Sequence, residues 1–400
     1  AQRLHIAVAD LKRMPAKTDL AFPKIAIVST WGSRCGIAAY AEAQASAIPP
    51  DVLHIFANDD AIPLGEDGKN IRRVWRSGLQ DDLRLLTTAL QECDPDVVVF
   101  QFNFGFFRLD VLGRLIHRLR DAGKAVHIIL HSTADVDKPD LKISLRDAAP
   151  AFARATRLIV HGLDDLNRLK AFGLGHNAML LPHGVPALPV GSPGERQMQT
   201  AALRTRQAVG LNRVPLIATF GFLLPGKGLR QLLEAHHILC KSAASAFGAK
   251  PRLLMLNALY PAPVSEEERN ACQELIGKLG LTGQVTLMTD YLPEEQALTL
   301  LNMADLIVFP YQATQESSSA AVRMGLASRR PVAVTPLAIF DDVRHVTHQL
   351  PGITPPEMAA GIEELLKADG HWRRRRWFAP KKPVKPSQIT DQQAAWVDAC

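Results

Sequence analysis

A glutamate followed by three serines, Glu316 to Ser319, stands at the predicted start of a helix. The first backbone N–H groups of a helix have no partner inside it and lie at the positive end of its dipole, so they can bind phosphate or hydroxyl oxygens. A carboxylate beside them can accept hydrogen bonds from paired sugar hydroxyls. Alternatively, Ser317 only caps the helix and Glu316 only favours its positive end. These four residues alone leave both interpretations open.

The surrounding elements place this segment at the edge of a parallel sheet. Asp305 to Phe309 is an apolar run typical of a strand buried on both faces, and Pro331 to Thr335 is a second one. Ser317 to Ala327, between them, has the spacing of a helix. Ligands bind in the crevice beyond the carboxyl ends of such strands. We therefore predict that Glu316 faces a ligand.

A second candidate phosphate contact lies in a glycine-containing turn near the start of the chain. Lys24 to Ser29 is typical of a buried strand, and the turn after it carries Gly32 and Gly36 before a helix of small residues. Such a turn lets the backbone approach a phosphate. Glycine also simply permits tight turns, so the turn alone is weak evidence for a site.

Two more strand ends carry candidate residues. His131 follows the predicted strand Val126 to Leu130, where it either contributes to a site or is a hydrogen-bonded structural residue. Gln101 to Phe107 is a phenylalanine-rich loop after the predicted strand Val97 to Phe100. This loop either receives an apolar or lipid-linked acceptor, dips into a membrane interface, or packs into the core.

The composition suits two domains, because four hundred residues, 47 % of them hydrophobic, can form two cores. The formal charge is +6, a modest excess from which no nucleic-acid partner is predicted. Two basic clusters stand out, Arg72 to Arg76 and Arg373 to Arg376. They either attract an anionic lipid surface or phosphorylated substrates, or they are ordinary solvated faces.

The cysteine pattern favours a reducing cytosol. The five cysteines are dispersed, odd in number and without metal-ligand spacing, which predicts free thiols. No apolar run reaches the roughly 20 residues that a membrane-spanning helix needs, and no signal peptide is evident. The chain begins at Ala1 rather than methionine, so we expect a segment of a longer polypeptide, with trimming of the initiator as the alternative.

The segment ESSSAAVRMGLASRRPVAV resembles retaining glycosyltransferases of the GT-B fold, in the large family (family four, group one) that includes many bacterial lipopolysaccharide and exopolysaccharide enzymes. Members carry a glutamate, small residues and a second glutamate eight positions on, then a small-residue helix and a PVV-like strand. Glu316 matches the first glutamate, which implies a contact with donor-sugar hydroxyls. Met324 stands at the second position, where the family glutamate binds the ribose.

The resemblance extends to the turn after Pro215 to Phe220. Lys227, between glycines and before a helix, matches the family lysine that pairs with the donor diphosphate in place of a metal. As an alternative it is an exposed loop lysine. Phe222 stands where the family has arginine, and Arg323 or Arg34 is the predicted compensating cation.

Three other passages match the family. Gly32 and Gly36 match a glycine-rich loop that faces the donor phosphates and the acceptor. His131 matches a histidine that contacts the donor sugar near its reacting carbon. Tyr291 and Leu292 fall near the base or the ribose.

The predicted fold is α/β, GT-B, with two Rossmann-like doubly wound domains facing a central cleft. The predicted divisions are 1–22, an extension; 23–188, the acceptor domain; 189–213, a linker with a helix; 214–372, the nucleotide-sugar domain; and 373–400, a basic tail with a possible crossover helix.

The predicted reaction moves a hexose from a nucleotide diphosphate sugar to a hydroxyl of a glycan or lipid-linked glycan, with retention of configuration and without metal or other cofactor. The enzyme is expected in the cytoplasm, with peripheral contact to an anionic membrane as an option. Predicted catalytic residues are His131, Lys227 and Glu316. The predicted donor contacts are Gly32, Gly36, Gly226, Lys227, Tyr291, Leu292, Glu316, Ser317, Ser318, Ser319 and Arg323.

The sequence also bears on four alternative classes of protein. Met324 and Phe222 suggest a non-catalytic glycosyltransferase-like module, and a nucleotide-sugar epimerase would use the same fold. A dehydrogenase is disfavoured because the turn after Ser29 lacks G-x-G-x-x-G. The D-x-D triplet Asp135 to Asp137 would suggest the metal-dependent glycosyltransferase fold, which we reject because the chain has two doubly wound halves and Lys227 as a basic substitute.

Overall fold

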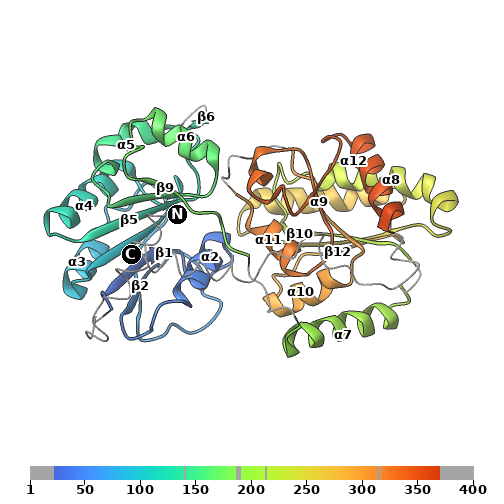
Figure 1. Cartoon of the computed structure of the whole chain (residues 1–400), viewed down its shortest axis with the longest axis horizontal. Helices are drawn as coiled ribbons and strands as arrows, with labels where there is room; N and C mark the ends of the chain where they lie inside the picture. Colours follow the sequence, from blue (N-terminus) through green and yellow to red (C-terminus); the bar gives the residue numbers. More distant parts are fainter. Residues whose placement is uncertain are drawn as a thin grey trace, which may run out of the picture.

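The computed structural model describes residues 22–138, 141–185, 191–211, 214–312, 314, 316 and 318–369. Two α/β halves lie side by side, each a parallel sheet between helices (Figure 1). The predicted extension, apart from Phe22, and the predicted basic tail with its crossover helix and its cluster Arg373 to Arg376 fall outside the described residues. None of the described helices is long and apolar enough to span a bilayer.

The first half has a seven-stranded parallel sheet with the order β3-β2-β1-β4-β5-β8-β9. Its central strands are predominantly apolar because helices cover both faces. In β1, Ala26 and Val28 pack toward α3, α4 and α5, whereas Ile25 and Ile27 pack toward α2. The elements are β1 (Ile25–Ser29), α2 (Gly36–Ala45), β2 (Leu53–Asn58), β3 (Ile71–Trp75), α3 (Arg84–Cys93), β4 (Val97–Phe102), α4 (Leu109–Asp121), β5 (Ala125–Leu130), the hairpin strands β6 (Val136–Lys138) and β7 (Leu141–Ile143), α5 (Leu145–Phe152), β8 (Arg157–Val160), α6 (Leu163–Ala171) and β9 (Ala178–Leu180).

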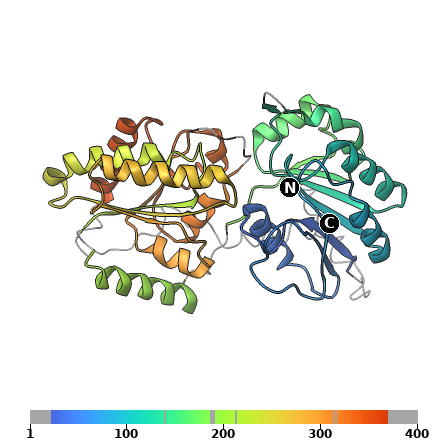
Figure 2. The ribbon, with the colours of Figure 1, turned by 180° about the vertical axis from the view of Figure 1, so that it is seen from behind.

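The second half has a six-stranded parallel sheet with the order β12-β11-β10-β13-β14-β15. Seen from behind in Figure 2, α8 and α9 lie on one face of this sheet and α7 and α10 on the other. The elements are α7 (Pro193–Ala208), β10 (Leu216–Phe222), α8 (Leu229–Ala246), β11 (Arg252–Ala258), α9 (Pro263–Lys278), β12 (Val285–Met288), α10 (Glu294–Asn302), β13 (Leu306–Phe309), α11 (Ala320–Ala327), β14 (Val332–Val334), a 3-10 helix (Ala338–Val343), β15 (His348–Gln349) and α12 (Pro355–Asp369).

Helix α7, which falls within the predicted linker, packs onto the second half. Its Arg206 is 8 % exposed and donates from two guanidinium nitrogens to the Asp305 carboxylate, at 2.9 and 2.8 Å. The same carboxylate accepts from the Leu216 amide at 2.8 Å. This buried pair ties α7 to the starts of β10 and β13.

The phenylalanine-rich loop packs into the core of the first half. Phe102, Phe104 and Phe107 are 0, 6 and 1 % exposed. Phe107 packs against Trp75 with ring centroids 4.8 Å apart. Of the three interpretations of this loop, core packing is therefore the one that the structure supports, because the buried rings have no surface left for a lipid.

Candidate functional site

Lys227 and Glu316 lie together at the carboxyl edge of the second sheet. Lys227 follows β10 and Glu316 follows β13, which are neighbouring strands, and Lys227 Nζ is 2.7 Å from Glu316 Oε2. The lysine side chain is 13 % exposed and its ammonium lies 4.3 Å from the centroid of the Tyr311 ring. Burial alone would lower the pKa of Lys227, but Tyr311 and Glu316 outweigh it and the pKa is raised. Lys227 is therefore a fixed cation.

Two glycines bring these loops together. Gly226 and Gly228 have φ of +82° and +74°, a region that L side chains rarely adopt. A Cβ on Gly228 would lie 1.7 Å from the carbonyl oxygen of Pro310, at the end of β13. The Gln312 amide donates to the Gly226 carbonyl at 2.8 Å. The two loops are thus in backbone contact, which holds Lys227 beside Glu316.

Helix α11 begins at Ala320, so the predicted start at Ser317 is wrong by three residues. Ser319 is the N-cap, because its hydroxyl accepts from the Val322 amide at 3.3 Å and is held 3.0 Å from the Tyr311 hydroxyl. Ser317 lies outside the described residues. Within the described part of the chain, the inaccessible Ser318 hydroxyl has no hydrogen-bond partner. The helix start and the Ser318 hydroxyl therefore keep unused hydrogen-bonding capacity beside Glu316.

The glycine-containing turn of the first half faces this helix start. Helix α2 lies at the side of the first half that faces α11 (Figure 1). It begins at Gly36, and a Cβ on Gly36 would lie 3.9 Å from the Cβ of Ala320. Gly32 has φ of +57°, its amide donates to Glu42 at 2.9 Å, and its carbonyl accepts from the Leu64 amide at 2.6 Å. Neither α2 nor α11 has an acidic residue in its first turn. Two positive helix ends therefore meet where the halves touch.

His131 belongs to a ring cluster that includes residues the sequence prediction did not assign to the site. Its Nε2 lies 2.7 Å from Gln101 Oε1, and its ring centroid lies 5.0 Å from that of Tyr40. His161 and His183 also contact the Tyr40 ring, with centroids at 5.1 and 4.7 Å. Burial lowers the pKa of His131 well below its ordinary value, which makes its imidazole neutral at pH 7. Each histidine follows the end of a neighbouring strand, a signal in the sequence that could have predicted the cluster.

The Arg323 guanidinium forms an ion pair and hydrogen bonds with other residues of the protein. Its guanidinium is 1 % exposed, pairs with Asp342, and donates to the Ser319 carbonyl at 2.9 Å and to the His183 carbonyl at 3.4 Å. The last bond joins α11 to the segment where the first half ends. The predicted donor contact of Arg323 stays a prediction, and the guanidinium already has a carboxylate partner without a donor.

Three aromatic side chains line the neighbouring strand ends. The Phe222 ring lies 5.3 Å from that of Tyr260 and 6.2 Å from that of Tyr291, with which it is stacked. Arg34, from the turn before α2, places its guanidinium carbon 5.9 Å from the centroid of the Tyr291 ring. Leu292, the other predicted base contact, packs against the apolar core of the second half.

The basic cluster at β3 is neutralised by carboxylates. Arg72 pairs with Glu92 at 2.8 Å, Arg73 with Asp67 at 2.7 Å, and Arg76 with Asp59 at 2.7 Å. Of the two interpretations of this cluster, an ordinary solvated face is the one that the structure supports, because each arginine already has a counter-charge.

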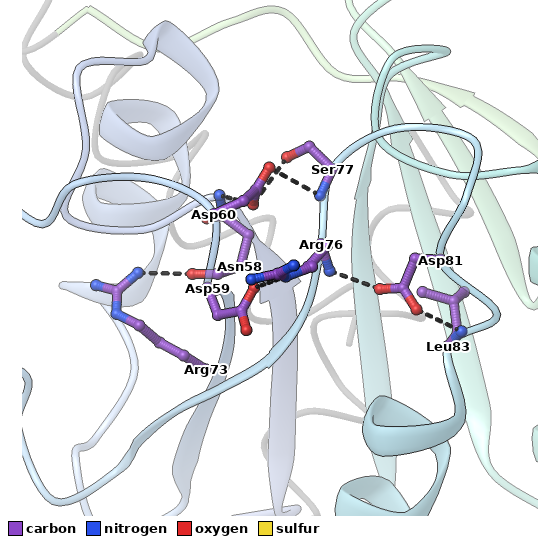
Figure 3. Close-up of polar contacts among 8 residues, drawn as sticks. All are labelled: Asn58, Asp59, Asp60, Arg73, Arg76, Ser77, Asp81 and Leu83. Carbon is purple, nitrogen blue, oxygen red and sulfur yellow. Dashed lines mark hydrogen bonds and ion pairs between the residues drawn. The ribbon is translucent and has the colours of Figure 1, made fainter.

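The same contacts brace the loop after β2. Figure 3 shows Asp60 bonded to Asn58 and Ser77, and Arg73 bonded to the Asn58 carbonyl. Leu64, in the middle of this loop, bonds to the Gly32 turn. The network therefore positions the loop beside the proposed site.

Among the described residues, no group of three or more histidine, cysteine or acidic side chains could hold a metal ion. Asp137 of the D-x-D triplet lies on the β6 and β7 hairpin, where it pairs with Lys142 at 3.3 Å.

Two doubly wound parallel sheets that meet through the loops at their carboxyl ends define the GT-B fold, and the chain has this fold. It is similar to Anabaena HepE in complex with UDP and glucose, with a TM-score of 0.70 and 14 % identity over 94 % of this chain and 98 % of that one. It is also similar to a UDP-forming trehalose-phosphate synthase from Burkholderia xenovorans, with a TM-score of 0.67 and 12 % identity over 94 % and 98 %.

Sucrose-phosphate synthase from Thermosynechococcus elongatus is a third similar structure, with a TM-score of 0.65 and 14 % identity over 94 % of each chain. No protein-family model matches the chain, and no curated protein is significantly similar to it in sequence. At these identities the likeness establishes the fold, and the function has to be argued from the site.

Proposed function

We propose that this chain is a glycosyltransferase that moves a hexose from a nucleotide diphosphate sugar to an acceptor hydroxyl. The observation that carries the proposal is the contact of Lys227 with Glu316 beside the start of α11, with the start of α2 opposite. This arrangement combines a fixed cation and two positive helix ends with a carboxylate that can accept sugar hydroxyls. The printed names of the similar structures, which include UDP, UDP-glucose and UDP-forming synthases, support a nucleotide-sugar donor.

The residues have distinct roles in this proposal. Lys227 and the first amides of α11 stabilise the negative charge of the departing diphosphate, which makes a metal unnecessary. Glu316, whose side chain is 50 % exposed, accepts hydroxyls of the donor sugar. His131, a neutral imidazole already oriented by Gln101, lies against the reacting face of the sugar. Ser318 adds a hydroxyl that has no partner among the described residues.

We propose retention of the anomeric configuration and membership of family four, as the sequence resemblance implies. No side chain is nominated as a covalent nucleophile, because the acceptor would be delivered on the leaving-group side of the sugar. Gly32 and Gly36 would face the donor phosphates, and Tyr291 and Leu292 would lie near the base or ribose.

For the acceptor, we propose a glycan or lipid-linked glycan made in polysaccharide or lipopolysaccharide biosynthesis, at the cytoplasmic side of a membrane. The supporting observation is the braced loop after β2, where Ile62 and Leu64 are 88 % and 53 % exposed. Apolar side chains held beside Gly32 suit an acceptor with an apolar part. Because the phenylalanine-rich loop is buried, we propose that the loop after β2 receives the apolar part of the acceptor in its place.

The proposal is tested by titrating the protein with UDP, GDP and ADP sugars and by following anomeric product configuration by NMR. Lys227→Met and Glu316→Gln should each lower kcat/KM by about 100-fold or more, equivalent to roughly 2 to 4 kcal/mol. Lys278→Met, which removes an exposed lysine on α9, serves as the matched control and should change nothing. Nucleotide-sugar binding that neither site variant weakens would refute the site.

Two other functions predict different results. A non-catalytic module would bind donor without transfer or hydrolysis, and an epimerase would release nucleotide without needing an acceptor.

A further inference from the structure

The charges of the second half balance at the proposed site. Lys227 is matched by Glu316, and Arg323 is matched by Asp342. A nucleoside diphosphate carries more than one negative charge, so these two neutral pairs do not by themselves neutralise it. A further cation is needed if the site takes up the whole leaving group.

Arg34 of the first half meets this need by its position. It is exposed, and within the part of the chain that the structure describes it forms no ion pair. Its guanidinium carbon lies 5.9 Å from the Tyr291 ring of the second half, so the side chain already reaches across the boundary between the halves. Two residues on, Gly36 approaches Ala320 at the start of α11. The turn from Arg34 to Gly36 in the first half therefore contacts the second half at two places, at Tyr291 and at the start of α11 beside Glu316.

The surroundings of Arg34 favour an anionic ligand over a permanent protein partner. Glu42, a carboxylate of the first half that acts electrostatically on Tyr291 as Arg34 does, accepts a hydrogen bond from the Gly32 amide at 2.9 Å. Ser33, beside Arg34, is 7 % exposed, and its hydroxyl has no hydrogen-bond partner among the described residues. The buried Ser33 hydroxyl and the Arg34 guanidinium, which form no hydrogen bond and no ion pair, respectively, within the described residues, lie just before a helix whose first turn has no acidic residue.

We propose that Arg34 binds the diphosphate of the nucleotide donor from the half opposite to Lys227. Both halves then contribute charge to the same leaving group, and the donor binds tightly only when the two halves are in contact. Arg34 contributes little to recognition of the nucleoside itself. This inference rests on the proposed function, since it assumes that the donor lies beside Lys227.

The test compares UDP with uridine by isothermal titration, with GDP and guanosine or ADP and adenosine used if those nucleotides bind more tightly. Arg34→Gln should raise the Kd of the nucleoside diphosphate by about 10-fold or more and leave the Kd of the nucleoside unchanged. Arg34→Lys should retain most of the affinity because it keeps the charge. Arg204→Gln, which removes an exposed arginine on α7, is the control and should bind like the wild type.

The outcomes separate this inference from the proposed function. Loss of nucleotide binding in Lys227→Met but not in Arg34→Gln would overturn the role of Arg34 alone. Equal losses in Arg34→Gln and Arg34→Lys, or an equal loss for uridine, would also overturn it, because the charge would then not be the cause. A wild-type protein that binds no nucleoside diphosphate would overturn the proposed function and this inference together.

Discussion

Replacing Gly228 by alanine should separate the loop that carries Lys227 from the loop that carries Glu316. Two effects add. A positive φ of 74° costs a residue with a Cβ about 1 kcal/mol. The new Cβ would also lie 1.7 Å from the Pro310 carbonyl oxygen, so one backbone must move. Overpacking of this kind costs about 1 to 3 kcal/mol. We expect Gly228→Ala to lower the free energy of unfolding by roughly 2 to 4 kcal/mol.

Gly248 provides a matched control, because its φ is +71° and a Cβ there would meet nothing within 4 Å. Gly248→Ala should therefore lose only the backbone contribution of about 1 kcal/mol and keep full activity. Urea denaturation measures the stability difference, and donor kinetics measure the displacement of Lys227, which should lower kcat/KM about 10-fold or more. Equal stability losses in the two variants, with equal activity, would refute the reasoning from the loop contact.

Three further variants test separate parts of the structure. Asp305→Asn should lower the free energy of unfolding by about 3 to 5 kcal/mol, because it leaves the Arg206 charge buried without its partner. The control is Glu92→Gln, which removes one member of an exposed ion pair and should lower the free energy of unfolding by less than about 1 kcal/mol in the same denaturation experiment. Burial lowers the pKa of His161 to about 4 from its ordinary 6.5, so its contribution to stability is present above pH 6.5 and is lost as the pH falls toward 4. His161→Gln should flatten the stability profile between those values, and an unchanged slope would contradict this. Ser318→Ala should weaken nucleotide binding without lowering the melting temperature, because its hydroxyl has no partner among the described residues, and a drop in melting temperature would show a structural role instead.

The elements that could be predicted from the sequence are those whose pattern is set by burial. Strands such as β1 and β13 are continuous apolar runs because both faces of each sheet are covered, so their positions follow from composition alone. Lys227 and Glu316 each follow a predicted strand. Because the carboxyl ends of neighbouring parallel strands lie at the same edge of a sheet, the sequence predicts that the two residues are close together. By contrast, β3 has the sequence IRRVW, and its two consecutive arginines interrupt the apolar run that would predict a buried strand. Its Arg72 pairs with Glu92, which is 20 residues further along the chain, and its Arg73 pairs with Asp67, which precedes it by 6 residues.

The start of α11 could not be predicted because three consecutive serines are equally good caps by composition. The choice of Ser319 is made by Tyr311, whose hydroxyl lies 3.0 Å from the serine hydroxyl and whose ring also packs under Lys227. A single aromatic residue outside the helix thus sets both the helix start and the position of the cation. Local propensity carries no information on such a contact, since it depends on how the loop after β13 folds back.

Arg323 connects the proposed donor site to the boundary between the halves. Helix α11 has only eight residues, with its capped start beside Glu316 and Arg323 one turn later. From there Arg323 donates to the His183 carbonyl of the first half, and its charge is held by Asp342. The same side chain therefore contacts both the N-cap residue of α11, through the Ser319 carbonyl, and the His183 carbonyl of the first half. Arg323 therefore joins the start of α11 to the segment where the first half ends through protein contacts, and its predicted contact with the donor stays a prediction.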